Sequence, residues 1–343
     1  MIENRLISIA ELEQYGPVSS LSEQVVTLVT HQKATWELAG RNYAGLALAE
    51  FRNFDFGHFK IVAQYNPERI RSSAAKTDLK SINERPCFLC PQNLPEPQKG
   101  ILTQDKFLIL VNPFPIFPVH LTITLVEHKP QLLHEHIADL LRISRELDEL
   151  TIFYNGPECG ASAPDHFHFQ AVFGGILPFE NEYDSLKKYH SEILIFNNNL
   201  KVFSVENYLR RFIAVESDNE EAICFHLNLI ISAMQVKSYS SEPRVNILCN
   251  YLDNHWRVVL FPREKHRPSQ YTAVPENQIM FSPAAVELGG LAVFPRSEDF
   301  EKINKELIAD MYKQVTLQKE KYINLVLKYL GSEQKARKHN IPF

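Results

Sequence analysis

The sequence predicts an α+β protein in which helices cross an antiparallel sheet, and three observations support this class. Residues 107–126 read as two consecutive strands, residues 131–150 as an amphipathic helix, and residues 151–173 as two further strands. The last strand alternates polar and apolar residues from His166 to Phe173, which is the period of a strand with one buried face. Helix and strand patterns return more loosely after residue 200, which favours a sheet built from two halves.

The composition is that of a soluble globular protein. The chain has 343 residues, of which 45% are hydrophobic and 22% charged, so it can bury a large core. A net charge of -5 argues against non-specific binding to nucleic acid or to a membrane surface. Neither a signal-peptide pattern nor a run of about 18 apolar residues is seen. Five cysteines, two of them in a Cys-x-x-Cys, fit a reducing compartment. We therefore expect a cytoplasmic protein.

The N-terminal part is predicted to be helical to about residue 50 and to form a strand over residues 54–65. The next segment, residues 66–76, mixes small residues with cations. Guanidinium groups chelate phosphate oxygens in a fork, so Arg69 and Arg71 are candidates for phosphate binding. A solvated charged face is the alternative interpretation. A second basic cluster, Arg263 to Arg267, is expected to be such a solvated face.

The alternating strand places His166, His168 and Gln170 in a row on one face of the sheet. Two imidazoles and an amide are costly to bury without partners, so this face is expected to look into a site. The alternative is a wet sheet face that happens to hold histidines.

Cys87 and Cys90 stand three residues apart in a turn, a spacing at which two thiolates can bind one tetrahedral Zn²⁺. Such a site needs two more ligands, and because the sequence has no second Cys-x-x-Cys, histidines would have to supply them. A pair of buried reduced cysteines and a redox dithiol are the alternatives.

Three motifs occur in a specific order: Cys-Phe-Leu-Cys at residues 87–90, Asn-Pro-Phe-Pro at 112–115, and His-x-His-x-Gln at 166–170. In this order they resemble the transferase branch of the histidine-triad superfamily, over roughly residues 60 to 300. That branch includes galactose-1-phosphate uridylyltransferase, diadenosine tetraphosphate phosphorylase and the GDP-hexose phosphorylases. The resemblance implies two histidine-triad-like halves, the second without its own motif. We expect an N-terminal helical segment over residues 1–55, a catalytic half over 56–200 and a second half over 201–343.

The resemblance also implies roles for individual residues. It implies a structural zinc ion whose ligands are Cys87, Cys90, His128 and His166. It implies that phosphate and nucleotide are bound by Arg69, Arg71, Asn112, Phe114, Asn155 and Ser162. The sequence departs from the family at Pro113, where many relatives have an acidic residue, and a proline-shaped turn is the plain interpretation of that segment.

By the same resemblance His168 is the nucleophile, and Gln170 replaces the third histidine of the hydrolase branch. An amide can hydrogen-bond a phosphate oxygen but cannot shuttle protons, so the site favours transfer or phosphorolysis. The expected substrate is a nucleoside diphosphate sugar or a dinucleoside polyphosphate, with phosphate or a sugar 1-phosphate as acceptor. Residues 283–296 and 154–170 look closer to the GDP-hexose phosphorylases, whereas the cysteine motif favours hexose-1-phosphate uridylyl transfer. A non-catalytic nucleotide-binding zinc protein is the other alternative. A homodimer is also implied, because the superfamily often dimerises.

Overall fold

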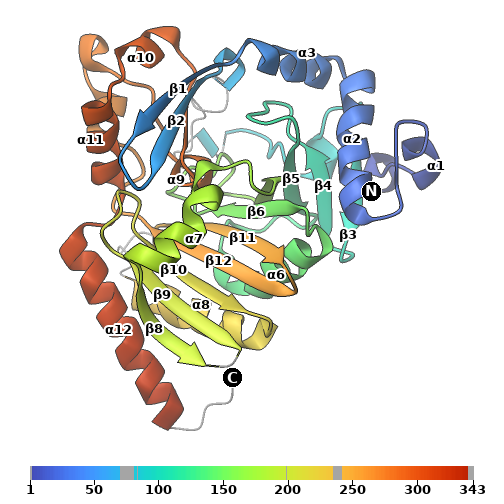
Figure 1. Cartoon of the computed structure of the whole chain (residues 1–343). Helices are drawn as coiled ribbons and strands as arrows, with labels where there is room; N and C mark the ends of the chain where they lie inside the picture. Colours follow the sequence, from blue (N-terminus) through green and yellow to red (C-terminus); the bar gives the residue numbers. More distant parts are fainter. Residues whose placement is uncertain (1, 70–80, 83, 198, 235–241, 339–343) are drawn as a thin grey trace.

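A ten-stranded sheet runs through the part of the chain that the structure describes (Figure 1). The structure is a computed structural model that describes residues 2–69, 81–82, 84–197, 199–234 and 242–338. The strand order is β3-β4-β5-β7-β6-β11-β12-β10-β9-β8, and all neighbouring pairs are antiparallel. The bounds are β3 Gly100–Thr103, β4 Phe107–Val111, β5 His120–Leu125, β6 Leu150–Asn155, β7 His168–Phe173, β8 Glu192–Asn197, β9 Leu200–Val205, β10 Phe212–Ser217, β11 Val245–Leu252 and β12 His255–Pro262.

The two halves of this sheet repeat one topology in mirrored order. The first five strands run β3-β4-β5-β7-β6 from one edge, and the next five run β8-β9-β10-β12-β11 from the other. In chain order, each half has a helix between its third and fourth strands. These helices are α6 (Ile137–Glu146), between β5 and β6, and α8 (Glu220–Ala233), between β10 and β11. The halves join where β6 pairs with β11. The predicted α+β class with two similar halves is therefore confirmed. The division at residues 55 and 200 stays a prediction, because both halves share one sheet.

Strand residues alternate between two hydrophobic clusters that cover opposite faces of the sheet. One face packs against α6, α8 and three further helices, and Figure 1 shows the long C-terminal helix lying against α8. The added helices are α2 Leu21–Thr35, α3 Glu37–Gly45 and α12 Lys319–Lys338. The other face packs against α7 Pro178–His190, α9 Ala285–Leu288, α10 Ser297–Lys302 and α11 Lys305–Val315. The short α1, Ile9–Leu12, packs against α2.

A second, three-stranded sheet joins residues 50–65 to residues 291–294, which are far apart in the chain. The hairpin β1 (Glu50–Asp55) and β2 (Lys60–Tyr65) is joined by β13 (Leu291–Phe294), which runs parallel to β2. Arg69 follows β2 directly, in the short 3-10 helix Pro67–Arg69. The pairing of β2 with β13 therefore places Arg69 beside a segment from the end of the second half.

Several elements differ from the sequence-based expectation. The helix expected over residues 131–150 spans only Ile137–Glu146, because the backbone N–H of Gln131 donates to the carbonyl of Pro164 instead of entering a helix. Residues 297–315 form two helices, α10 and α11, because the side chain of Asn304 caps a new helix by accepting from the backbone N–H of Leu307. β7 begins at His168, so His166 lies in the turn before it. Among the described residues no helix is both long and apolar enough to cross a membrane.

Candidate active site

His168, the first residue of β7, has its imidazole ring held in one orientation. Its Nδ1 lies 2.8 Å from the carbonyl oxygen of His166. A carbonyl oxygen can only accept, so Nδ1 carries the proton and Nε2 keeps its lone pair in the neutral ring. Burial lowers the pKa of His168 to about 4, which favours this neutral form. The arrangement leaves Nε2 unprotonated on a side chain that lines a pocket.

Gln131 clamps the backbone on both sides of that histidine. Its side-chain oxygen accepts from the backbone N–H of His168 at 2.8 Å. Its amide nitrogen donates to the carbonyl oxygens of His168, at 2.9 Å, and Asn155, at 3.0 Å. This fully buried amide therefore fixes the start of β7 against the end of β6. No sequence pattern indicates this role, because Gln131 lies 37 residues before its partner at the edge of an expected helix.

The four residues expected to bind zinc come together beside β7. The ligand atoms of Cys87, Cys90, His128 and His166 all lie within 4.8 Å of one another. The Sγ atoms of Cys87 and Cys90 lie 3.2 and 3.5 Å from Nδ1 of His166, and Cys90 Sγ lies 3.2 Å from Nδ1 of His128. Two sulfur and two nitrogen donors at these separations fit the tetrahedral coordination of Zn²⁺. The cluster can therefore hold a metal ion.

The surroundings of this cluster suit a cation as well. The other ring nitrogen of His166, Nε2, donates to the carbonyl oxygen of Leu125 at 2.7 Å, which leaves Nδ1 free to coordinate. Burial and the neighbouring Cys87 raise the pKa of the Cys90 thiol to about 11. A divalent metal bound by Cys90 would deprotonate this thiol and hold it as a thiolate.

One pocket beside Gln170, which we call the polar pocket, combines side chains from both halves of the chain. The first half supplies Arg69, Asn112, Asn155, Ser162 and Gln170, and the second half supplies His266, Arg267, Ser282 and Glu287. The loop that carries Ser162 packs closely on the second half. Gly160 in this loop has φ +97°, and a Cβ atom there would lie 2.5 Å from the Cβ of Ala284.

The amide of Asn155 presents only donors to the polar pocket. Its oxygen accepts from the side-chain nitrogen of Asn246 and from the backbone N–H of Ala285, both at 2.8 Å. Its NH2 group is therefore the part left for a ligand. Arg69 is anchored by donating to the carbonyl oxygen of Phe114 at 2.5 Å, and its Nε has no partner among the described residues. Donors and cations together suit an anionic ligand.

A second pocket, which we call the apolar pocket, adjoins the first. It is lined by the hydrophobic residues Trp36, Leu38, Phe88, Leu89, Leu94, Leu110, Val111 and Phe114, and by His168 and Gln170. Asn112, Ser162 and Gln170 line both pockets, so the two meet beside His168. Apart from Phe114, the large hydrophobic residues of the apolar pocket were not predicted, because residues 36, 88 and 110 belong to separate elements whose contact only the fold creates.

The other candidate residues fall into three groups. Phe114 lines the apolar pocket, as a nucleotide contact requires. The side chain of Asn112 is already engaged, because its oxygen accepts from the N–H of Phe114 and its nitrogen donates to Thr122. Arg71 lies outside the described residues.

The expectation of a solvated basic face at Arg263 to Arg267 is wrong. Arg263 is 4% exposed and donates to carbonyl oxygens of Val315, Pro283, Lys265 and His266. Arg267 and His266 line the polar pocket instead of facing solvent. Arg267 is held there by donating to Ser282 at 2.9 Å and by stacking over the ring of Tyr271. Ser282 follows Arg267 by only 15 residues in the chain, and Tyr271 is closer still. No periodic pattern in the sequence indicated either contact.

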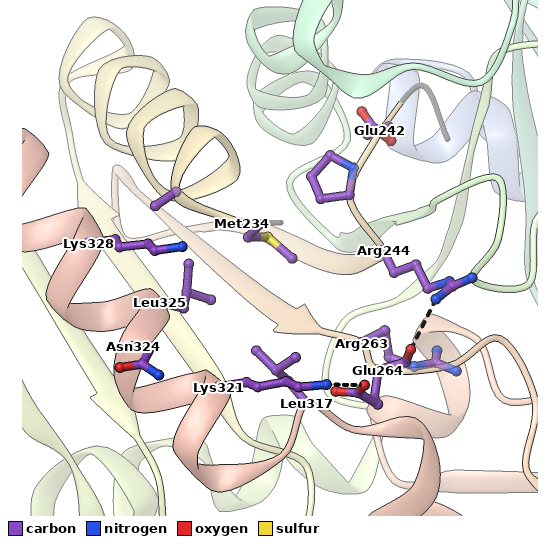
Figure 2. Close-up of a pocket in the computed structure, with 12 residues that line it drawn as sticks. Met234, Glu242, Arg244, Arg263, Glu264, Leu317, Lys321, Asn324, Leu325 and Lys328 are labelled. Carbon is purple, nitrogen blue, oxygen red and sulfur yellow. Dashed lines mark hydrogen bonds and ion pairs between the residues drawn. The ribbon is translucent and has the colours of Figure 1, made fainter. Parts of the chain in front are cut away.

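A further groove lies between α8, α12 and the ends of β11 and β12, as Figure 2 shows. It shares no lining residue with the polar or apolar pocket. Glu264 occupies its centre, accepting from Lys321 at 2.6 Å on its side chain and from Arg244 on its carbonyl oxygen (Figure 2). Three of its cations, Arg244, Arg263 and Lys321, are thus engaged within the chain, and no histidine or cysteine is among the described residues that line it. The two pockets beside His168 are therefore the candidate active site.

The fold has the two halves in one sheet that the resemblance to the histidine-triad transferases implied. The sequence comparisons agree: residues 185–332 match the family described as GDPGP1-like, C-terminal domain, and residues 28–173 match a domain of unknown function, DUF4922. The resemblance drawn from the three motifs is therefore confirmed. No curated protein matches the chain in sequence.

Solved structures show the same fold at low identity. Yeast Ap4A phosphorylase Apa2 in complex with AMP is 16% identical to this chain, with a TM-score of 0.57 over 88% of this chain and 98% of that one. The same yeast enzyme in complex with Ap4A is 17% identical, with a TM-score of 0.53 over 82% of this chain and 97% of that one. At such identities the likeness concerns the fold.

Proposed function

We propose that this protein is a nucleotidyltransferase that works through a nucleotidyl-histidine intermediate on His168. The proposed donor is a nucleoside diphosphate sugar or a dinucleoside polyphosphate. The observation that supports this most directly is the ring of His168, whose Nδ1–H is fixed on the carbonyl of His166 while Nε2 lines the pocket. A buried neutral imidazole with a free Nε2 beside a cationic pocket is suited to attack phosphorus.

The reaction has two balanced steps. In the first, the Nε2 lone pair attacks the α-phosphorus, a P–N bond forms, and the bridging P–O bond breaks. The electron pair of that bond leaves with the sugar phosphate or nucleoside polyphosphate. In the second, an oxygen of the acceptor attacks the same phosphorus and the P–N bond breaks, which returns neutral His168. Charge builds on the equatorial oxygens in both steps, so donors in the polar pocket lower both barriers.

The two pockets divide the substrate between them. The hydrophobic side chains of the apolar pocket suit a base and ribose, and Phe114 offers a ring for stacking. Arg69, Arg267 and the NH2 group of Asn155 suit phosphate groups in the polar pocket. Glu287 also lines this pocket, where its carboxylate accepts from the N–H of Ala284. Burial raises the pKa of Glu287, which reduces its repulsion of an anion.

The acceptor is proposed to be phosphate or a sugar 1-phosphate rather than water. Gln170 stands where a hydrolase of this superfamily has a third histidine, and an amide cannot take a proton from water at neutral pH. An acceptor that already carries a nucleophilic oxygen needs no such base. Phosphorolysis is favoured because the yeast enzyme of the same fold is an Ap4A phosphorylase. Hexose-1-phosphate uridylyl transfer is the alternative, supported by the Cys-Phe-Leu-Cys motif.

Zinc is proposed to have a structural role. It would be held by Cys87, Cys90, His128 and His166 and would fix the turn before β7, so that the carbonyl of His166 stays aligned with His168. The reducing compartment inferred from the cysteines, a cytoplasmic location and a homodimer stay predictions.

The test is intact protein mass after brief mixing with a panel of nucleotide sugars and dinucleoside polyphosphates, quenched at alkaline pH. We expect a mass gain equal to one nucleoside monophosphate, lost on acid treatment and absent in His168→Asn. The mass of the adduct names the base, so a uridylyl adduct would favour the uridylyltransferase alternative. Absence of any adduct while nucleotides still bind would overturn the proposal in favour of a non-catalytic nucleotide-binding protein.

A further inference from the structure

His120 is a fully buried histidine at the start of β5, and it contacts the active-site amide directly. Its Nε2 lies 2.8 Å from the side-chain oxygen of Gln170. Its Nδ1 accepts a hydrogen bond from the backbone N–H of Ile116 at 3.2 Å. No motif in the sequence singled out this residue, because its partner lies 50 positions later in the chain.

The protonation of this ring follows from its two partners. A backbone N–H can only donate, so Nδ1 of His120 must be the bare nitrogen that accepts from Ile116. In a neutral imidazole the proton then sits on Nε2, which donates to Gln170. The atom of Gln170 that receives this proton must be its oxygen, because the amide NH2 group is a donor. The backbone N–H of Ile116 thus determines the tautomer of His120, and this tautomer determines the orientation of the Gln170 side-chain amide.

The ring is also kept neutral, which the arrangement requires. A doubly protonated imidazole could not accept from Ile116. Burial lowers the pKa of His120 to about 3, and the positive charge of Arg69 acts in the same direction.

We propose that His120 is a positioning residue for the reaction: it holds the Gln170 amide with its oxygen inward and its NH2 group toward the substrate phosphate. Gln170 lines both pockets, so this NH2 group lies where they meet beside His168. Were the amide turned over, its oxygen would face the phosphate oxygens and repel them. The inference rests on the proposed function, because it assigns Gln170 a phosphate to contact.

Two substitutions separate the two hydrogen bonds of the ring. The oxygen of His120→Asn stands near the place of Nδ1, so it can accept from Ile116 but cannot reach Gln170. The amide nitrogen of His120→Gln stands near the place of Nε2, so it can donate to Gln170 while Ile116 loses its acceptor. We expect His120→Asn to unfold close to the wild-type temperature but to form the nucleotidyl adduct about 10- to 100-fold more slowly, the range for one hydrogen bond to a charged group. We expect His120→Gln to be less stable but to keep an adduct rate close to wild type.

A merely structural role would give the opposite order, with adduct rates following thermal stability across the two variants. That result would overturn the proposal.

The double variant His120→Asn, Gln170→Ala supplies a second test. If His120 acts through Gln170, adding His120→Asn to Gln170→Ala changes the adduct rate no further. If the two substitutions instead lowered the adduct rate independently, so that their fold-changes multiplied in the double variant, His120 would not act through Gln170.

A measurement without substrate separates this inference from the proposed function. In the full chain labelled with ¹⁵N-histidine, the nitrogen shifts of His120, assigned with the His120→Gln variant, report which ring nitrogen carries the proton. We expect a neutral ring protonated on Nε2 at pH 7. A proton on Nδ1 would overturn the inference whatever the activity. If the wild type forms no adduct with any nucleotide while His120 is protonated on Nε2, the proposed function fails and the orientation of Gln170 stands.

Discussion

The two halves of the sheet place very different side chains at the same topological positions. The third strand of each half has six residues, β5 His120–Leu125 and β10 Phe212–Ser217, so their registers with β7 and β12 can be compared directly. Gln170 pairs with Thr122, and Val259 pairs with Ala214, the third residue in each case. The counterparts of His168, Gln170 and His120 in the second half are therefore Arg257, Val259 and Phe212.

The difference lies in what covers this face. In the second half α7 lies across it, and Phe179 of α7 meets Phe212 with ring centroids 5.1 Å apart. Val259 is 1% exposed in the same cluster. In the first half the corresponding residues His168 and Gln170 line the two pockets instead. One scaffold thus carries a covered apolar face in one half and a polar, pocket-lining face in the other.

The largest difference between the halves is expected for the nucleophile. His168→Asn should slow adduct formation by about 10,000-fold or more, because the substitution removes the atom that forms the bond. The matched change in the second half, Arg257→Gln, should leave adduct formation unchanged and alter only stability, because Arg257 stacks on Tyr183 and pairs with Asp184. Intact mass and thermal unfolding of both variants check this. Equal loss of adduct in the two variants would break the comparison.

The next effect concerns the metal cluster. Cys87→Ser should lower the zinc content, measured by elemental analysis, and reduce the free energy of unfolding by about 3 kcal/mol or more. The control is Cys224→Ser on α8 of the second half, which should keep both zinc content and stability to within about 1 kcal/mol. A chain purified without bound zinc, with Cys87→Ser as stable as the control, would speak against a structural metal.

An exchange of polarity between the halves should separate activity from stability. Val259→Gln puts an amide into the covered apolar face and should reduce the free energy of unfolding by about 3 kcal/mol. Gln170→Met removes the amide of the open face, so it should slow adduct formation by about 100-fold while reducing the free energy of unfolding by only about 1–2 kcal/mol, because the buried Nε2–H of His120 loses its acceptor. Urea unfolding and adduct rates of both variants test the pair. The idea fails if Gln170→Met proves the less stable of the two.

The smallest effect is a pH dependence at the junction of the halves. Glu242, just before β11, accepts from the N–H of Leu133 and from the hydroxyl of Tyr154. Burial raises its pKa from 4.5 to about 7. Because the folded chain binds this proton more tightly, its contribution to stability is complete below about pH 4.5 and is lost as pH rises through about 7. That contribution amounts to about 3 kcal/mol at most.

Glu242→Gln, which cannot ionise, should therefore remove this part of the decline in unfolding free energy between pH 5 and pH 8. The exposed Glu298→Gln serves as the control and should leave the decline as it is. Urea unfolding at several pH values measures both variants. Identical curves for the wild type and Glu242→Gln would contradict a raised pKa.

The parts of this molecule that could be predicted from the sequence are those that depend on residues adjacent in the chain. The buried strand Phe107–Val111 and the strands β11 and β12 follow from unbroken or alternating apolar runs. The four metal-cluster residues and His168 came from short motifs whose order resembles a known family. What these predictions share is that neighbours along the chain carry the signal.

The parts that were missed depend on partners far away in the chain. Gln131 and His120 act through hydrogen bonds to residues 37 and 50 positions away, and nothing near them indicates those partners. The cluster at Arg263 to Arg267 looks like a solvated face by composition, yet Arg263 is buried among carbonyl groups of the second half. Composition describes charge, whereas burial depends on what the folded chain packs around it.

The parallel pairing of β2 with β13 has a consequence for how the protein matures. Val62 on β2 pairs with Leu291 on β13, so the polar pocket needs a segment that is synthesised long after β2. At about 5–20 residues per second, a ribosome takes roughly 10–50 s to add the residues between them. A nascent chain thus contains β7 and His168 well before Arg267 of the polar pocket has been synthesised, so this pocket is complete only once both halves of the sheet exist.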